Sequence, residues 1–164
     1  MTHLSRSLRM GSLRRLLMVA AGLTLVTSSS AQTARNRASG PAEEDPILHE
    51  YRGVQIGSLA DEVRKKLGNP ADKGDEQDFF VFGEKETAQV LYDKSHKVIA
   101  ISVDFTNGAN DVLTPQQVFG VDIQAKPDGS KYKLVRYPKA GYWVSYNRTQ
   151  GDSPMVSVTF QKLQ

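Results

Sequence analysis

Apolar residues recur first with a helical period and then with a strand period, and this order occurs twice along residues 47–164. In its first occurrence, Leu59, Val63 and Leu67 are spaced four apart and form one apolar stripe. Ser58 is suited to cap the start of such a helix, because its hydroxyl can accept a hydrogen bond from a first-turn amide. The pattern therefore predicts a short amphipathic helix.

Three strands are expected after this helix, at residues 78–82, 88–92 and 97–105. The last of them alternates most regularly between apolar and polar positions. Its expected buried face consists of Ile99, Ile101, Val103 and Phe105. Strict alternation is typical of an antiparallel strand with one buried face.

The same order returns in the second half of the chain. Thr114, Pro115 and Gln117 form a capping box with proline at the first helical position, and Gly120 ends the short helix. Strands are expected next, at residues 131–137, 142–148 and 155–161.

These two successive units, residues 53–105 and 112–164, have similar lengths. They predict an α+β fold of two tandem helix-plus-three-stranded antiparallel units. The helices are expected on one face of the sheet, which leaves the other face open for binding.

The first 31 residues have the layout of an export signal. Arg6, Arg9, Arg14 and Arg15 are followed by the apolar run of residues 16–26, and no acidic residue occurs in this segment. Small residues then lead to Ala31, where cleavage is expected. The apolar run has 11 residues, which is shorter than the roughly 20 that a membrane-spanning helix needs. The pattern predicts a periplasmic or secreted protein.

Removal of this segment changes the charge of the chain. The full sequence has 21 basic and 18 acidic residues, a net charge of +3. Loss of four arginines leaves 17 basic residues and a net charge of −1. The remaining basic residues are scattered, so no nucleic-acid partner is expected. Residues 32–46 have no large apolar residue and are interpreted as a disordered linker.

The chain contains no cysteine. The domain must therefore fold by packing alone, without the disulfides that many small exported domains use. A lipid anchor at the cleavage point is also not expected, because it would require a cysteine there. We expect neither a transmembrane anchor nor a lipid anchor in the mature chain.

Four short sequence motifs resemble those of a known family. Residues 57–63 read GSLADEV and residues 67–70 read LGNP, followed by VLYD at 90–93 and KVIAI at 97–101. These motifs resemble SmpA/OmlA (BamE-type) envelope domains over about residues 53–105. With the second unit included, the layout is similar to the beta-lactamase-inhibitor-protein-like fold. The resemblance implies a non-catalytic envelope protein that binds other proteins through its sheet or loops.

Candidate catalytic chemistry is sparse. The mature chain has two histidines, His49 and His96, and neither lies in a recognised nucleophile motif. The acidic cluster of Asp72, Asp75, Glu76 and Asp78 lacks the spacing of a calcium loop. It is interpreted as a solvated loop. We therefore predict no enzyme activity, no cofactor and no metal.

Aromatic residues gather in the second unit. In the strand at 142–148, Val144 is expected in the core, which would turn Trp143 towards the open face. Tyrosine, tryptophan and arginine commonly anchor protein interfaces. Trp143, Tyr137 and Arg136 therefore form a candidate partner-binding patch, with structural packing of Trp143 as the alternative.

The sequence leads to one main functional hypothesis and two alternatives. The main hypothesis is a non-enzymatic cell-envelope protein that binds another envelope protein through its open sheet face. The first alternative is a small-ligand or lipid-binding protein with a pocket between the two units. The second is an enzyme, which the missing motifs disfavour.

Overall fold

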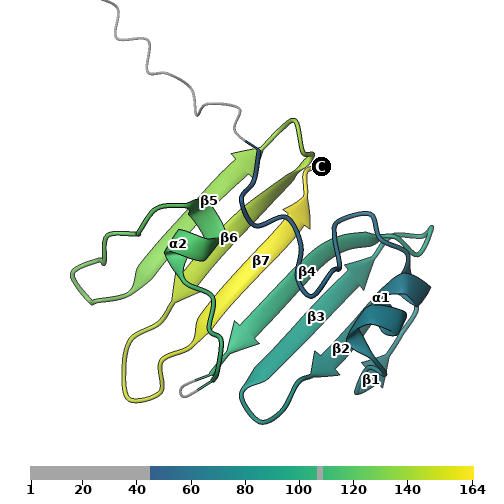
Figure 1. The fold of residues 1–164 in the computed structure, drawn as a ribbon, viewed down its shortest axis with the longest axis horizontal. Coiled ribbons are helices and arrows are strands. Elements are labelled where there is room, and N and C mark those ends of the chain that lie inside the picture. The colour runs from purple at the N-terminus through teal and green to yellow at the C-terminus, as the bar shows by residue number, and fades with distance from the viewer. Residues whose placement is uncertain (1–44, 107–108) are drawn as a thin grey trace, which may run out of the picture. The chain divides into compact units, whose positions relative to one another are not determined.

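Seven strands form one antiparallel sheet in the order β1-β2-β3-β4-β7-β6-β5 (Figure 1). The computed structural model describes residues 45–106 and 109–164. The predicted signal segment and residues 32–44 of the predicted linker lie outside the described residues. The strands are β1 Asp72–Lys73, β2 Gln77–Val81, β3 Glu86–Tyr92, β4 Val98–Phe105, β5 Lys131–Tyr137, β6 Tyr142–Arg148 and β7 Val156–Lys162.

The predicted division into two tandem helix-plus-three-strand units is wrong. β4 and β7 pair over six positions, from Ala100 opposite Gln161 to Phe105 opposite Val156, and so join all strands into one sheet. The helices are minor elements: α1 has eight residues and α2 has five. Pairing β4 with β7 satisfies backbone groups that two separate sheets would leave open at their edges.

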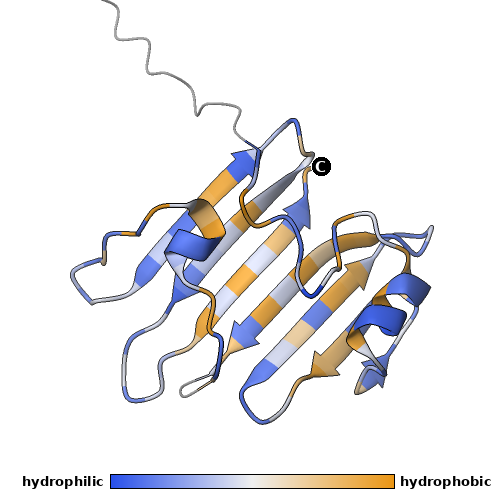
Figure 2. Ribbon diagram, viewed as in Figure 1, coloured by the Kyte–Doolittle hydropathy of each residue, from blue (hydrophilic) through white to orange (hydrophobic). Residues whose placement is uncertain are grey.

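One face of this sheet carries the core. Hydropathy alternates along the strands (Figure 2), and the apolar positions of β3, β4, β6 and β7 contribute to a single buried cluster. Val63 of α1 (Ala60–Leu67) and Val118 of α2 (Pro115–Phe119) belong to the same cluster. Both helices therefore cover the same face of the sheet, and no helix among the described residues covers the other face.

The start of α1 differs from the expectation. The helix begins one residue later than predicted, so Leu59 is the N-cap, and its amide donates to the Glu62 carboxylate. Ser58 accepts a hydrogen bond from the Gln55 amide instead. Leu59 is 45% exposed, while Ala60 and Val63 are buried. As the N-cap, Leu59 has an extended backbone, so it does not continue the helical stripe that contains Val63, and it lies outside the core.

A β-bulge alters the expected face of β4. The register shifts between Leu91 and Tyr92 of β3, so that Tyr92 pairs with Val98 and Leu91 pairs with Ala100. Ile99 is the extra residue and is only partly buried, whereas Val98 is 1% exposed. The extra residue on β4 reverses the alternation of buried and exposed positions at this point. Val98 therefore takes the core position predicted for Ile99.

The expectations for the second half hold more closely. The hydroxyl of Thr114 accepts from the Gln117 amide, and the Gln117 side chain accepts from the Thr114 amide. Gly120 ends α2 in the left-handed region at φ 71°. The bounds predicted for β5 and β6 are confirmed.

The segment before α1 crosses the helix-covered face as a strap (Figure 1). It is not a strand: Tyr51 and Val54 close a tight turn by two backbone hydrogen bonds of 2.9 Å. The Tyr51 hydroxyl donates to Glu86 of β3 at 2.5 Å, and Arg52 forms an ion pair with the same carboxylate at 2.9 Å. These contacts fix the strap to the sheet.

Candidate functional site

The free edge of the sheet is the first candidate site. β5 is the last strand in the sheet order, and no backbone hydrogen bond joins its outer edge to another described segment. On the open face, Tyr132 is 49% exposed and Leu134 is 39% exposed, and Arg136 is also exposed. Long exposed edge strands are templates for pairing with another chain. The opposite edge of the sheet is the two-residue strand β1.

The structure divides the three predicted binding residues between the two faces. Val144 is 1% exposed, so its predicted place in the core is confirmed. Trp143 lies on the open face, partly buried, directly opposite Arg136 on β5. Tyr137 lies on the helix-covered face, where its ring is 6.3 Å from that of Tyr142. Arg136 and Trp143 are therefore brought together, and Tyr137 does not share their surface.

We call the exposed group on the open face the β5 edge surface. It consists of Tyr132, Leu134, Arg136 and Trp143. The Lys126 ammonium lies 5.5 Å from the centre of the Tyr132 ring and flanks this surface. The surface combines tyrosine, tryptophan and arginine, which are enriched in protein interfaces, with the aliphatic side chain of Leu134.

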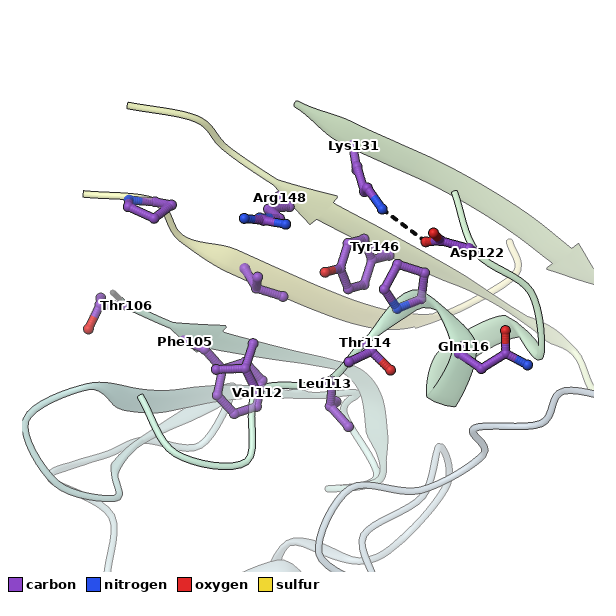
Figure 3. Close-up of a pocket in the computed structure, with 13 residues that line it drawn as sticks. Phe105, Thr106, Val112, Leu113, Thr114, Gln116, Asp122, Lys131, Tyr146 and Arg148 are labelled. Atoms are coloured by element: carbon purple, nitrogen blue, oxygen red, sulfur yellow. Dashed lines mark hydrogen bonds and ion pairs between the residues drawn. The ribbon is translucent and has the colours of Figure 1, made fainter. Parts of the chain in front are cut away.

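The second candidate site is a cleft on the helix-covered face (Figure 3). It has a volume of about 660 Å³ and opens between the residues that lead into α2 and the ends of β4, β6 and β7. Its apolar lining includes Phe105, Val112, Leu113 and Val156. Its polar rim is formed by Arg148, Lys131, Asp122 and the Tyr146 hydroxyl.

Charges at this rim are unequally paired. Lys131 donates to Asp122 at 2.9 Å, and this hydrogen bond lowers the pKa of the Asp122 carboxyl. The Arg148 side chain has neither a hydrogen bond nor an ion pair to any other described residue. The rim of the cleft therefore keeps one uncompensated positive charge.

A buried ionic network was not anticipated. Asp78 is fully buried, and its carboxylate accepts from Arg64 at 2.9 and 3.1 Å, from the Tyr92 hydroxyl at 2.8 Å and from the Gly74 amide at 3.2 Å. Burial alone would raise the pKa of Asp78, but these four hydrogen bonds outweigh burial and lower it. The interpretation of the acidic cluster as solvated is wrong at this position.

The signal for this burial was present in the strand pattern. Asp78 shares the face of Phe80 on β2 because the two are separated by one residue, and Phe80 is 1% exposed. Alternation therefore assigns Asp78 to the core. Its partner Arg64 lies one turn beyond Ala60 on α1.

The other candidates for chemistry lie apart. His49 and His96 are both exposed, and His96 occupies a turn at φ 55°. Within the described ranges, no group of three His, Asp or Glu side chains is placed to hold a metal ion. Neither of the helices in that part of the chain has the length and apolar character required to cross a membrane.

No protein-family model, curated protein or solved structure matches this chain. The similarity to BamE-type domains therefore remains a prediction from the sequence motifs.

Proposed function

We propose that this protein is a non-enzymatic, exported binding protein that engages a protein partner through the β5 edge surface. Its export is inferred from the pattern of residues 1–31. The observation that carries the binding proposal is the place of β5 at the edge of the sheet, with Trp143 and Arg136 side by side on the open face.

The chemistry of β5 favours an extended, acidic partner segment. The strand reads KYKLVRY and has no acidic residue; of its three cations, Arg136 lies on the open face, and Lys131 is already paired with Asp122. Its free edge can form backbone hydrogen bonds with an added strand, while side chains at alternate positions select the partner. Arg136 then meets a carboxylate of the partner segment, and Leu134 and Tyr132 supply apolar contact.

Substitutions at this surface test the proposal. We expect Trp143→Ala and Arg136→Ala each to weaken capture of a partner from envelope extract by at least tenfold, because interface aromatics and arginines commonly contribute about 2 kcal/mol or more. Quantitative pull-down with crosslinking measures this, with Phe79→Ala as the control. Phe79 is 37% exposed on the same open face, but it lies on β2 near the opposite edge.

Folding has to be separated from binding, because Trp143 is partly buried. Leu134→Asp places a charge on the exposed edge without opening a cavity, so we expect it to retain the wild-type melting temperature and to lose capture. Equal capture by Arg136→Ala, Leu134→Asp and the wild-type protein would refute the proposed surface.

A further inference from the structure

The strand residues at the base of the cleft on the helix-covered face are cationic at one end and apolar at the other. Four adjacent strands each contribute one residue to a single row across the sheet, because Lys131 pairs with Arg148, Arg148 with Val156, and Val156 with Phe105. The row is cationic on β5 and β6 and apolar on β7 and β4. A ligand lying along this row would meet a positive end and an apolar end.

The positive end has donors available. Arg148 is exposed and has no ion-pair partner among the described residues, whereas the charge of Lys131 is matched by Asp122 at 2.9 Å. The Tyr146 hydroxyl has no hydrogen bond to a described residue. Every fully buried side-chain oxygen among these residues has a hydrogen-bond partner, so the Tyr146 hydroxyl is not fully buried and is open to the cleft that this residue lines. Burial raises the pKa of Tyr146 even though Arg148 lowers it, so the hydroxyl keeps its proton at neutral pH.

The apolar end is walled by the segment before α2. Val112 and Leu113 are partly buried and pack against the core, and both line the cleft together with Phe105 (Figure 3). Small-molecule sites typically occupy roughly 300–1,000 Å³ and combine mostly apolar walls with a few polar groups. The cleft, at about 660 Å³, has this size, and its walls combine apolar side chains with a larger share of polar ones.

We propose that this cleft binds a small molecule that has one carboxylate on an apolar body. Arg148 pairs with the carboxylate, Tyr146 donates a hydrogen bond to it, and Phe105, Val112, Leu113 and Val156 cover the apolar body. A guanidinium matches a carboxylate by two parallel hydrogen bonds. The single uncompensated positive charge also matches a singly charged group.

This site is independent of the β5 edge surface. Arg148 points to the helix-covered face, whereas Arg136 lies on the open face of the same pair of strands. Each can therefore be removed without touching the other site, and failure of one proposal leaves the other standing.

Titration calorimetry of the purified protein with decanoate, below its micellar concentration, tests the carboxylate site. We expect decanoate to bind, and both acetate and decan-1-ol to bind at least tenfold more weakly, since each lacks one half of the ligand. Arg148→Gln is expected to weaken decanoate binding at least tenfold. Tyr146→Phe is expected to weaken it several-fold. The matched control, Arg136→Gln, removes an exposed arginine from the opposite face and should bind decanoate as the wild-type protein does.

Three results would overturn the proposal. The first is the absence of decanoate binding to the wild-type protein. The second is equal affinity for decan-1-ol and decanoate, which would show an apolar cleft without anion recognition. The third is equal weakening by Arg148→Gln and Arg136→Gln, which would show a general effect of positive charge. Melting temperatures of both variants, measured alongside, establish that each is folded.

Discussion

Replacing Asp78 by asparagine is expected to lower the free energy of unfolding by about 3–5 kcal/mol at pH 7, as removal of one partner of a buried ion pair commonly does. All the groups around this carboxylate are donors: Arg64, the Tyr92 hydroxyl and the Gly74 amide. An asparagine side chain has the same shape, but it turns its own amide towards those donors and leaves Arg64 with only the exposed Asp61 carboxylate, at 3.5 Å, as a counterion. Urea denaturation measures the loss.

The stability loss of Asp78→Asn is expected to depend on pH in a definite direction. Hydrogen bonding holds the pKa of Asp78 below its ordinary value in the folded state. The ionised form is therefore stabilised by folding, and this contribution is fully present above the unfolded pKa of about 3.9. It is lost as the pH falls through the folded pKa. The difference between wild type and Asp78→Asn should therefore shrink steadily as the pH is lowered below about 4.

Asp75→Asn is the matched control for Asp78→Asn. Asp75 belongs to the same acidic cluster, but it is exposed. We expect its substitution to change stability by no more than about 0.5 kcal/mol, the usual range for surface positions. A loss below about 1 kcal/mol for Asp78→Asn, or a loss that does not depend on pH, would show that the network does not stabilise the folded protein.

Local features of this fold could be predicted because their causes are local. The capping box of Thr114 and Gln117 involves residues three apart, and the bounds of β5 and β6 follow from alternation within each strand. The same reasoning fails at Ile99, because a bulge depends on the register with β3, which the sequence of β4 alone does not contain.

The single sheet and the residues that line the cleft were not predicted, because both depend on pairing between strands that are far apart in the sequence. β4 and β7 are separated by some fifty residues, and the sequence of neither strand predicts that it pairs with the other. The cleft depends on this pairing, since Phe105 reaches it from β4 and Arg148 from β6. Trp143 and Arg136 lie close together in the chain across one hairpin, which is why their proximity could be anticipated, whereas the residues that line the cleft could not.

Because both halves form one sheet, a substitution at its centre is expected to cause the second large loss of stability. Phe160 on β7 is 1% exposed and lies between Val144 on β6 and Ile101 on β4, both equally buried. Phe160→Ala removes a large side chain at the centre of this core and is expected to cost about 3–5 kcal/mol. Since native domains are stable by only about 5–15 kcal/mol, the variant should unfold at a much lower urea concentration.

The form of that unfolding discriminates between one sheet and two units. Trp143 fluorescence reports on β6, and amide hydrogen exchange on β3 reports on the other half of the sheet. Because one core spans both halves, Phe160→Ala should destabilise both reporters by the same free energy and in one transition. Thr159→Ala is the control, because Thr159 faces the open side, where it contacts Ser102 at 3.1 Å; its loss should cost about 1 kcal/mol. Loss of the Trp143 signal while the β3 amides stay fully protected would instead mean that the halves fold separately, and that the pairing of β4 with β7 contributes little to their stability.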